Sequence, residues 1–311
     1  MGDVDGGDGG RGGGRSGPMI STNWGAATDA GLIRRDNEDA LLAQMPVFLV
    51  ADGMGGHAAG EVAAALAVGQ FATLAAAESD LGVETVARSI DEANRLVYET
   101  AASRSELRGM GTTVVGLALV TDRDQEVWLV FNVGDSRLYR LHDGELSQVT
   151  TDHSEVQELM ERGAISSDSM RHHPDRNVIT RALGVATAVE PDFWLLPPVP
   201  GERFLLATDG LTGEIGDDDI RRTLSDEVEP AVAATRLVEL ALQAGGHDNV
   251  TVVVVDVVAA TEGPEEDTAR GLDVKAEHDD VGEGRIPGRV LIDAVPTRFD
   301  EEVVPTAGPE D

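Results

Sequence analysis

Four aspartates stand at the ends of apolar runs, where the strands of a buried sheet would begin or finish. Asp52, Asp135 and Asp209 follow such runs, and Asp248 comes two residues before one. A single aspartate in such a place is usually a turn residue. Four that meet at one end of a sheet would repel one another and raise each other's pKa values unless cations neutralised them. The pattern therefore predicts a site for hard divalent cations.

The available donor atoms narrow the choice of metal and reaction. The chain contains no cysteine, so any metal must be bound by oxygen or by imidazole nitrogen. Oxygen donors suit Mg²⁺ or Mn²⁺, whereas zinc normally recruits more histidine. Two such ions can lower the pKa of a bridging water and hold it for in-line attack on phosphorus. The reaction also needs a cation on the phosphate oxygens, from Arg34 or Arg35, and an acid for the leaving alkoxide, from His57.

The elements that would carry these residues are visible as two kinds of hydrophobic pattern. Short runs rich in valine, leucine and phenylalanine, bounded by glycine and aspartate, predict strands. Apolar residues three and four apart predict helices, with Ser154 and Pro230 at helix starts and Gly245 at a helix end. Asp143-Gly144 predicts a tight hairpin turn. The predicted strands are 47–51, 114–120, 127–133, 203–207 and 250–258, and the predicted helices are 58–77, 83–97, 155–162 and 230–244.

Three regions of different composition divide the 311 residues. Residues 1–18 are half glycine, which predicts a flexible leader, and the abrupt change of composition favours Met19 as the start of translation. Residues 19–260 carry the strand and helix patterns, which predict one α+β domain. Residues 261–311 are acidic and lack any period, which predicts a disordered tail.

Charge and composition exclude several classes of function. The chain has 24 basic and 57 acidic residues, and region 19–260 alone has a net charge of −22. An acidic surface repels nucleic-acid phosphates, so we expect no nucleic-acid partner. No run approaches the roughly 20 apolar residues of a membrane helix, and no secretory signal is visible. We expect a monomeric, cytoplasmic protein without a membrane span.

Six short motifs follow one another in an order known from one family. They lie at residues 34–40, 51–61, 109–113, 133–137, 208–211 and 246–250. Together they resemble the metal-dependent, PP2C-type protein serine/threonine phosphatases, in their bacterial branch, over essentially all of residues 20–258. The resemblance implies a four-layer α-β-β-α sandwich of two antiparallel sheets flanked by helices. It places the metal centre at one end of that sandwich.

The resemblance also implies which residues bind metal. Asp52 would bridge the two main ions, and the carbonyl of Gly53 would bind the second. Asp209 and Asp248 would complete the first ion's shell. Asp135 would hold a weaker third ion together with Asp209. A further carboxylate, Glu38, would approach the second ion, mostly through water.

Two more residues and one segment receive roles from the same resemblance. Arg34, four residues before Glu38, matches the phosphate-binding arginine better than Arg35 does. His57 is placed as the leaving-group acid, although three residues separate it from Asp-Gly, whereas in animal members the histidine follows directly. The segment 151–184 resembles the family's mobile flap beside the active site, and we expect its adjacent histidines to be surface residues.

The implied function is hydrolysis of phosphoserine and phosphothreonine on proteins, which would reverse serine/threonine kinase signalling. The partners would be phosphorylated proteins, including the kinases and their substrates. One alternative is a catalytically inactive, phosphatase-like regulatory or phosphoprotein-binding module; another keeps the chemistry but acts on an anti-sigma-factor antagonist. A dinucleotide site at Gly53-Met54-Gly55 is disfavoured, because Asp52 would repel the phosphates.

Overall fold

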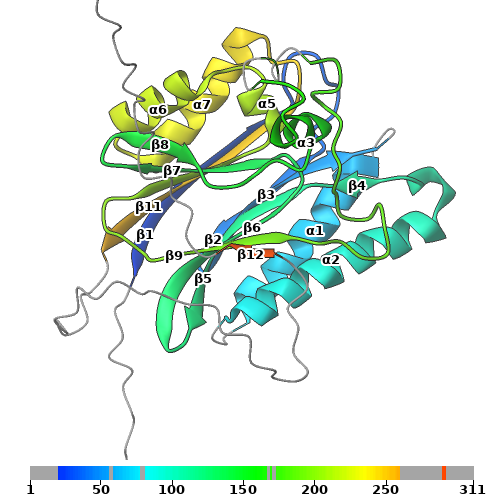
Figure 1. Ribbon diagram of the computed structural model, residues 1–311, viewed down its shortest axis with the longest axis horizontal. Coiled ribbons are helices and arrows are strands. Elements are labelled where there is room, and N and C mark those ends of the chain that lie inside the picture. The colour runs from blue at the N-terminus through cyan, green and yellow to red at the C-terminus, as the bar shows by residue number, and fades with distance from the viewer. Residues whose placement is uncertain are drawn as a thin grey trace, which may run out of the picture.

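The computed structural model describes residues 20–55, 59–77, 81–166, 169, 173–259 and 289–291. The expected leader lies outside these ranges, as does the expected tail apart from residues 289–291. His57 and His172 also lie outside the described residues. Two sheets stacked face to face, with helices on both outer faces, make up the described part of the chain (Figure 1). The predicted α+β, four-layer architecture is confirmed.

One sheet has five strands, all paired antiparallel. The turn between β7 and β8 is the predicted hairpin: Asp143 and Gly144 have φ angles of 50° and 79°, the left-handed values that a two-residue turn requires. The strands, in their order across the sheet, are β1 (Ser21–Asp29), β11 (Val250–Ala259), β10 (Arg203–Ala207), β7 (Arg137–His142) and β8 (Glu145–Gln148).

The second sheet has seven strands in the described residues. Its pairings are antiparallel except at the edge, where β12 lies parallel to β9. The order is β12 (Arg289–Leu291), β9 (Asp192–Leu196), β6 (Gln125–Val133), β5 (Val114–Asp122), β3 (Val47–Met54) and β2 (Asp39–Gln44), with β4 (Gly111–Thr112) paired to β3.

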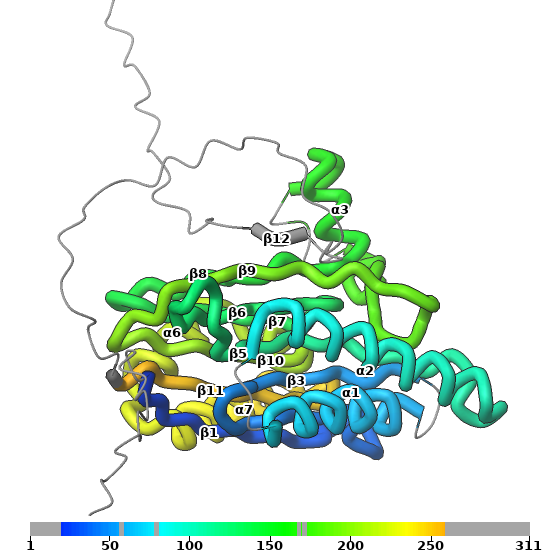
Figure 2. The backbone as a smooth tube through the Cα atoms, turned by 90° about the horizontal axis from the view of Figure 1, so that it is seen from below, coloured from blue at the N-terminus to red at the C-terminus, as the bar shows by residue number. Residues whose placement is uncertain are grey.

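Helices cover the outer face of each sheet, and Figure 2 shows the layers edge-on. Helices α1 (Ala59–Ala76) and α2 (Val83–Ser103) lie on the seven-stranded sheet, followed by a short 3-10 turn, η1 (Ser105–Leu107). The five-stranded sheet is covered by α5 (Asp209–Thr212), α6 (Asp217–Asp226) and α7 (Pro230–Ala244). Among the described residues, one further helix, α3 (Glu155–Glu161), stands apart from both layers.

The central strands alternate between two cores along their length. On β3, Phe48 and Val50 face the core between the sheets, whereas Leu49 and Ala51 face α1 and α2. Strand β11 does the same between the inter-sheet core and the α5–α7 side. Because both faces are buried, these strands appear in the sequence as continuous apolar runs instead of alternating patterns.

Helix α7 lies unusually close to β1 because of one glycine. A Cβ atom on Gly25 would come within 2.2 Å of the Cα of Ala231, a distance that no side chain tolerates. The helix begins at Pro230, as predicted, and ends before Gly245, whose φ is 159°. This close contact fixes α7 against the sheet whose other end carries Asp209 and Asp248.

Helix α1 has the length and composition of a membrane span, with 18 residues and a mean hydropathy of 1.4. The expectation that no run approaches this length was therefore incomplete, because alanine supplies much of the helix's apolar character. In the structure α1 packs on β2, β3 and α2, and Ala63, Ala67 and Phe71 are buried there. Of its residues, 33% are buried within the domain.

Candidate active site

Five aspartates gather at one end of the two sheets. Asp52 lies near the end of β3, directly opposite Asp39 at the start of β2. Asp135 follows β6, Asp209 opens α5 after β10, and Asp248 precedes β11. Their charges act on one another, since the pKa of each buried member is raised by its acidic neighbours. The structure therefore brings together the four aspartates predicted from the sequence and adds Asp39 to them.

Asp52 and Asp209 form the centre of this group. Burial raises the pKa of Asp52 well above its usual value, and the charges of Asp209, Asp39 and Asp135 raise it further. Burial and the charge of Asp248 also raise the pKa of Asp209. The two carboxyl groups lie close enough for each to shift the pKa of the other. Two carboxyl groups in contact must share a proton or a cation.

Asp135 and Asp39 flank this pair. Burial, followed by the charges of Asp209 and Asp152, raises the pKa of Asp135 to about 8. Burial likewise raises the pKa of Asp39 to about 7, against the effect of hydrogen bonds from Thr251 and Thr208. One carboxyl oxygen of each, Oδ1, is buried without a hydrogen-bond partner among the described residues. A buried oxygen of this kind destabilises the fold unless a hydrogen-bond donor or a cation binds it.

These features fit a hard divalent cation. The donor set is all oxygen, it is rich in charge, and it includes buried oxygens that have no hydrogen-bond partner in the described part of the chain. Within the described ranges, however, no three acidic or imidazole side chains stand close enough to form a finished metal cage. The residues therefore supply the oxygen ligands that such a cation prefers, at one end of the sheets, but they are not arranged as a complete coordination shell.

Gly53 and Glu38 lie beside Asp52. A Cβ on Gly53 would come within 2.2 Å of the Gly60 carbonyl oxygen and 2.4 Å of that of Glu38, so only glycine allows the backbone to pass here. Burial raises the pKa of Glu38, against the effects of a backbone hydrogen bond from Gly60 and the charge of Arg34. Both predicted residues therefore belong to this end of the sheet.

Arg34 reaches the site through an aspartate. Its Nη2 donates to Asp248 Oδ2 at 2.7 Å, and both side chains are partly exposed, at 53% and 37%. The neighbouring Arg35 is exposed. Of the two arginines that the sequence offered as phosphate ligands, the structure places Arg34 against a predicted metal ligand.

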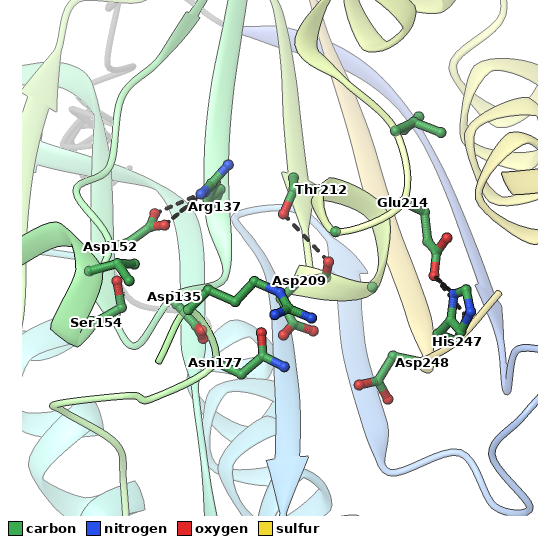
Figure 3. A pocket seen from close by; sticks show the side chains of 15 residues that line it. Asp135, Arg137, Asp152, Ser154, Asn177, Asp209, Thr212, Glu214, His247 and Asp248 are labelled. Atoms are coloured by element: carbon green, nitrogen blue, oxygen red, sulfur yellow. Dashed lines mark hydrogen bonds and ion pairs between the residues drawn. The ribbon is translucent and has the colours of Figure 1, made fainter. Parts of the chain in front are cut away.

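An open cleft of about 780 Å³ leads to these carboxylates. Asp135, Asp209 and Asp248 are among the residues that line it, and so is Asn177, from the segment predicted as a flap (Figure 3). The wall near Asp135 is an ion pair in which Arg137 donates to both carboxyl oxygens of Asp152. The cleft is thus wide, polar and accessible to a group on a protein surface.

Two site residues were not predicted from the sequence. Asp39 was only part of a motif, and its role depends on its pairing with Asp52 across two strands. Asn249 also was only part of a motif, with no role assigned to it. Its Oδ1 accepts from the backbone N of Glu38, and its Nδ2 donates to the carbonyls of Ala30 and Asp36. It thereby fixes the loop that carries Arg34 and Glu38.

The segment predicted as a flap begins with the expected helix cap. The Ser154 side chain accepts from the backbone N of Gln157 at 3.4 Å, and α3 follows. His173 Nδ1 lies 3.9 Å from Asp175 Oδ2, and the His173 side chain is 23% exposed. The proposed acid, His57, lies outside the described residues, so its role stays a prediction.

Known proteins resemble this chain in sequence. The model of the family described as protein phosphatase 2C matches residues 27–244. The serine/threonine protein phosphatase PstP of Mycobacterium tuberculosis is 40% identical over 238 residues, which are 76% of this chain and 45% of that protein. The chain thus spans about half the length of that relative. The serine/threonine phosphatase stp of Listeria welshimeri is 38% identical, over 74% of this chain and 93% of its own.

Solved structures agree with the sequence matches. The crystal structure of the Mycobacterium tuberculosis phosphatase PstP/Ppp has a TM-score of 0.72 at 38% identity, covering 77% of this chain and 100% of that one. The catalytic domain of PstP in complex with 2 manganese ions has a TM-score of 0.71 at 37% identity, with the same coverage. On the shared fold, the family match and the carboxylates at one end of the sandwich, this chain belongs to the protein phosphatase 2C family.

Proposed function

We propose that this chain hydrolyses phosphoserine and phosphothreonine on proteins. The observation that carries the proposal is the group of buried carboxylates with raised pKa values beside an open cleft. Relatives of similar sequence are named serine/threonine phosphatases. The width of the cleft suits a phosphorylated side chain on a protein segment, and we propose phosphorylated proteins as the substrates.

We further propose that Mn²⁺ or Mg²⁺ occupies the site. Asp52 would contact both main ions, with Asp209 and Asp248 on the first and the Gly53 carbonyl on the second. Asp135 would contribute to a third, weaker position. A solved relative in complex with 2 manganese ions supports the pair. When bound, such a pair supplies a water of lowered pKa held for attack on phosphorus.

The chain's own residues would place the phosphate. Arg34 pairs with Asp248, one of the residues that line the cleft, and this pairing holds its guanidinium beside the aspartate group. Its fork of donors suits two phosphate oxygens at once. Asn249 holds the loop of Arg34 through three hydrogen bonds. A phosphate would therefore meet a guanidinium that is already in place.

The test is Mn²⁺-dependent release of phosphate from a phosphothreonine peptide. Asp209→Asn keeps the shape of the side chain and removes its charge. We expect activity to fall by about 10³-fold, because a metal centre is worth several kcal/mol of transition-state stabilisation. Asp226→Asn, on the exposed end of α6, is the matched control and should retain full activity.

The result also decides between an enzyme and an inactive binding module. All the predicted metal carboxylates are present and gathered at one end of the fold, which favours the enzyme. Absence of turnover in the unmodified chain with Mn²⁺, together with retained binding of the phosphopeptide, would favour the module. Undiminished turnover in Asp209→Asn would contradict the assignment of the site.

A further inference from the structure

His153 is a buried histidine to which the proposed chemistry assigns no task. Its exposure is 5%, and it lies between Asp152 of the cleft wall and Ser154, which caps α3. Its hydrogen bonds reach three parts of the chain: the turn before Asp135, strand β9 and the end of the 154–180 segment. Because both ring nitrogens of this buried imidazole have hydrogen-bond partners, the orientation of the ring is fixed.

The first connection holds Gly134 at two points. The backbone N of His153 donates to the Gly134 carbonyl at 2.9 Å, and the backbone N of Gly134 donates to His153 Nδ1 at 3.1 Å. Gly134 has a φ of 118°, and a Cβ there would come within 2.6 Å of the Thr113 side chain. The residue immediately before Asp135 is therefore fixed by the histidine and by steric contact.

The second connection fixes the tautomer of the ring. Since Nδ1 accepts a hydrogen bond, the ring proton must be on Nε2. Nε2 lies 3.2 Å from Asp192 Oδ2, to which it donates. The Asp192 carboxylate also accepts from Arg181 Nη1 at 3.1 Å. Burial alone would raise the pKa of Asp192, but His153 and Arg181 bring it below its usual value, so Asp192 is an ionised acceptor.

The third connection ties the same histidine to the segment beside the cleft. The His153 carbonyl accepts from the backbone N of Thr180 at 2.8 Å, and the backbone N of Glu155 donates to the Val178 carbonyl at 2.9 Å. Both ends of the 154–180 segment therefore meet at His153. His153 therefore holds both the turn before Asp135 and the end of the 154–180 segment.

The Asp135 side chain depends on that support because it has few partners of its own. Its Oδ1 has no hydrogen-bond partner in the described part of the chain, and its neighbours Asp209 and Asp152 repel it. Its position therefore follows from the backbone of Gly134 and Asp135. We propose that His153, oriented by Asp192, is a positioning residue that aims the Asp135 carboxylate at its metal. The inference rests on the proposed function, in which Asp135 is a metal ligand.

Two substitutions separate positioning from simple packing. His153→Asn can place its Oδ1 where the ring Nδ1 stands, so it keeps an acceptor for the Gly134 backbone N. It loses the hydrogen bond to Asp192. His153→Leu fills similar space and removes both bonds. The stability control is Leu224→Ala, a truncation of a buried α6 side chain in the core on the α5–α7 side.

The first measurement is a calorimetric titration of the full chain with Mn²⁺. For His153→Leu we expect the weakest site to lose 10- to 100-fold in affinity, the range typical of residues that orient a metal ligand, with the tighter sites unchanged. His153→Asn should lose less than tenfold, and Leu224→Ala should bind as the unmodified chain does. The second measurement is the ¹⁵N spectrum of the metal-free protein, in which His153 should show a protonated Nε2 and an unprotonated Nδ1.

Several outcomes would overturn the inference. They are an Mn²⁺ isotherm of folded His153→Leu equal to that of the unmodified chain, an equal loss in Leu224→Ala, or a His153 ring protonated at Nδ1. A chain that binds no Mn²⁺ in any form would overturn the proposed function itself. Loss of the weakest site alone in His153→Leu, with rescue by His153→Asn, supports the positioning role.

Discussion

Replacing Asp135 with asparagine should stabilise the metal-free protein at alkaline pH. The substitution keeps the size of the side chain and removes a charge that is buried among acids. In the folded chain the pKa of Asp135 is about 8, against an ordinary value of 3.8. Between these values the folded protein holds a proton that the unfolded chain has lost. Asp135 therefore makes the metal-free protein less stable as the pH rises from about 4 to about 8.

The size of the effect follows from the same two pKa values. Each pKa unit corresponds to about 1.4 kcal/mol, so a difference of about 4 sets a ceiling near 6 kcal/mol for the cost of ionising Asp135. Relaxation and water penetration reduce the penalty of a buried charge. We expect Asp135→Asn to gain on the unmodified chain as the pH rises, so that it is about 2 kcal/mol more stable at pH 9 and more stable by a smaller amount at pH 5.

The assay is urea unfolding in EDTA at both pH values, with the midpoint and slope fitted separately. Asp226→Asn, an exposed acid at the end of α6, controls for the loss of one unit of net charge. Added Mn²⁺ should reverse the ranking, because a ligand that binds only the folded state stabilises it and the variant has lost one ligand.

Two results would refute this reasoning. One is an Asp135→Asn protein whose stability falls between pH 5 and pH 9 as steeply as that of the unmodified chain. The other is a gain in Asp226→Asn as large as that in Asp135→Asn. Either would mean that Asp135 is not an ionisable group under electrostatic strain in the metal-free fold.

Three further predictions concern the core, the cleft wall and the substrate. Phe48→Ala, at the centre of the inter-sheet core, should cost about 3–5 kcal/mol in urea unfolding; a loss below about 1 kcal/mol would contradict its place there. Asp152→Ala leaves the Arg137 guanidinium without its bidentate partner and should lower the free energy of unfolding by about 3–5 kcal/mol. The double variant Arg137→Met with Asp152→Leu removes both charges and should lower it by less. Phosphopeptides with basic flanks should be hydrolysed faster than acidic ones at low salt, given the acidic domain; equal initial rates would disprove this.

The strands best predicted from the sequence are those buried on both faces. Strand β10 has the predicted bounds, Arg203–Ala207, and the runs of β3 and β11 were recognised with longer true ends. Strands β1 and β2 were not predicted, because β1 carries mostly small and polar residues with one fully buried position, Gly25, and β2 has no fully buried position. Edge strands lack the two-sided burial that produces a continuous apolar run.

The site was predictable as a set of residues but not as a set of contacts. Aspartates at strand ends, and the order of the motifs, identified which carboxylates meet. The pairing of Arg34 with Asp248 joins residues 214 positions apart, and the role of Asp39 depends on strand register. The first follows from how the two sheets stack, and the second from how two strands pair within one sheet. No local pattern of spacing encodes either.

The parallel pairing of β12 with β9 has a consequence for solubility. Strand β9 is the outermost antiparallel strand of its sheet, and β12 occupies the outward backbone of Asp192–Trp194. An open row of amide and carbonyl groups at such a margin is a template to which a foreign chain adds, and natural proteins cover or blunt it. Here residues 289–291 supply that cover. A version of the chain that stops short of residue 289 would leave the backbone of β9 unpaired beside Asp192, the hydrogen-bond partner of His153.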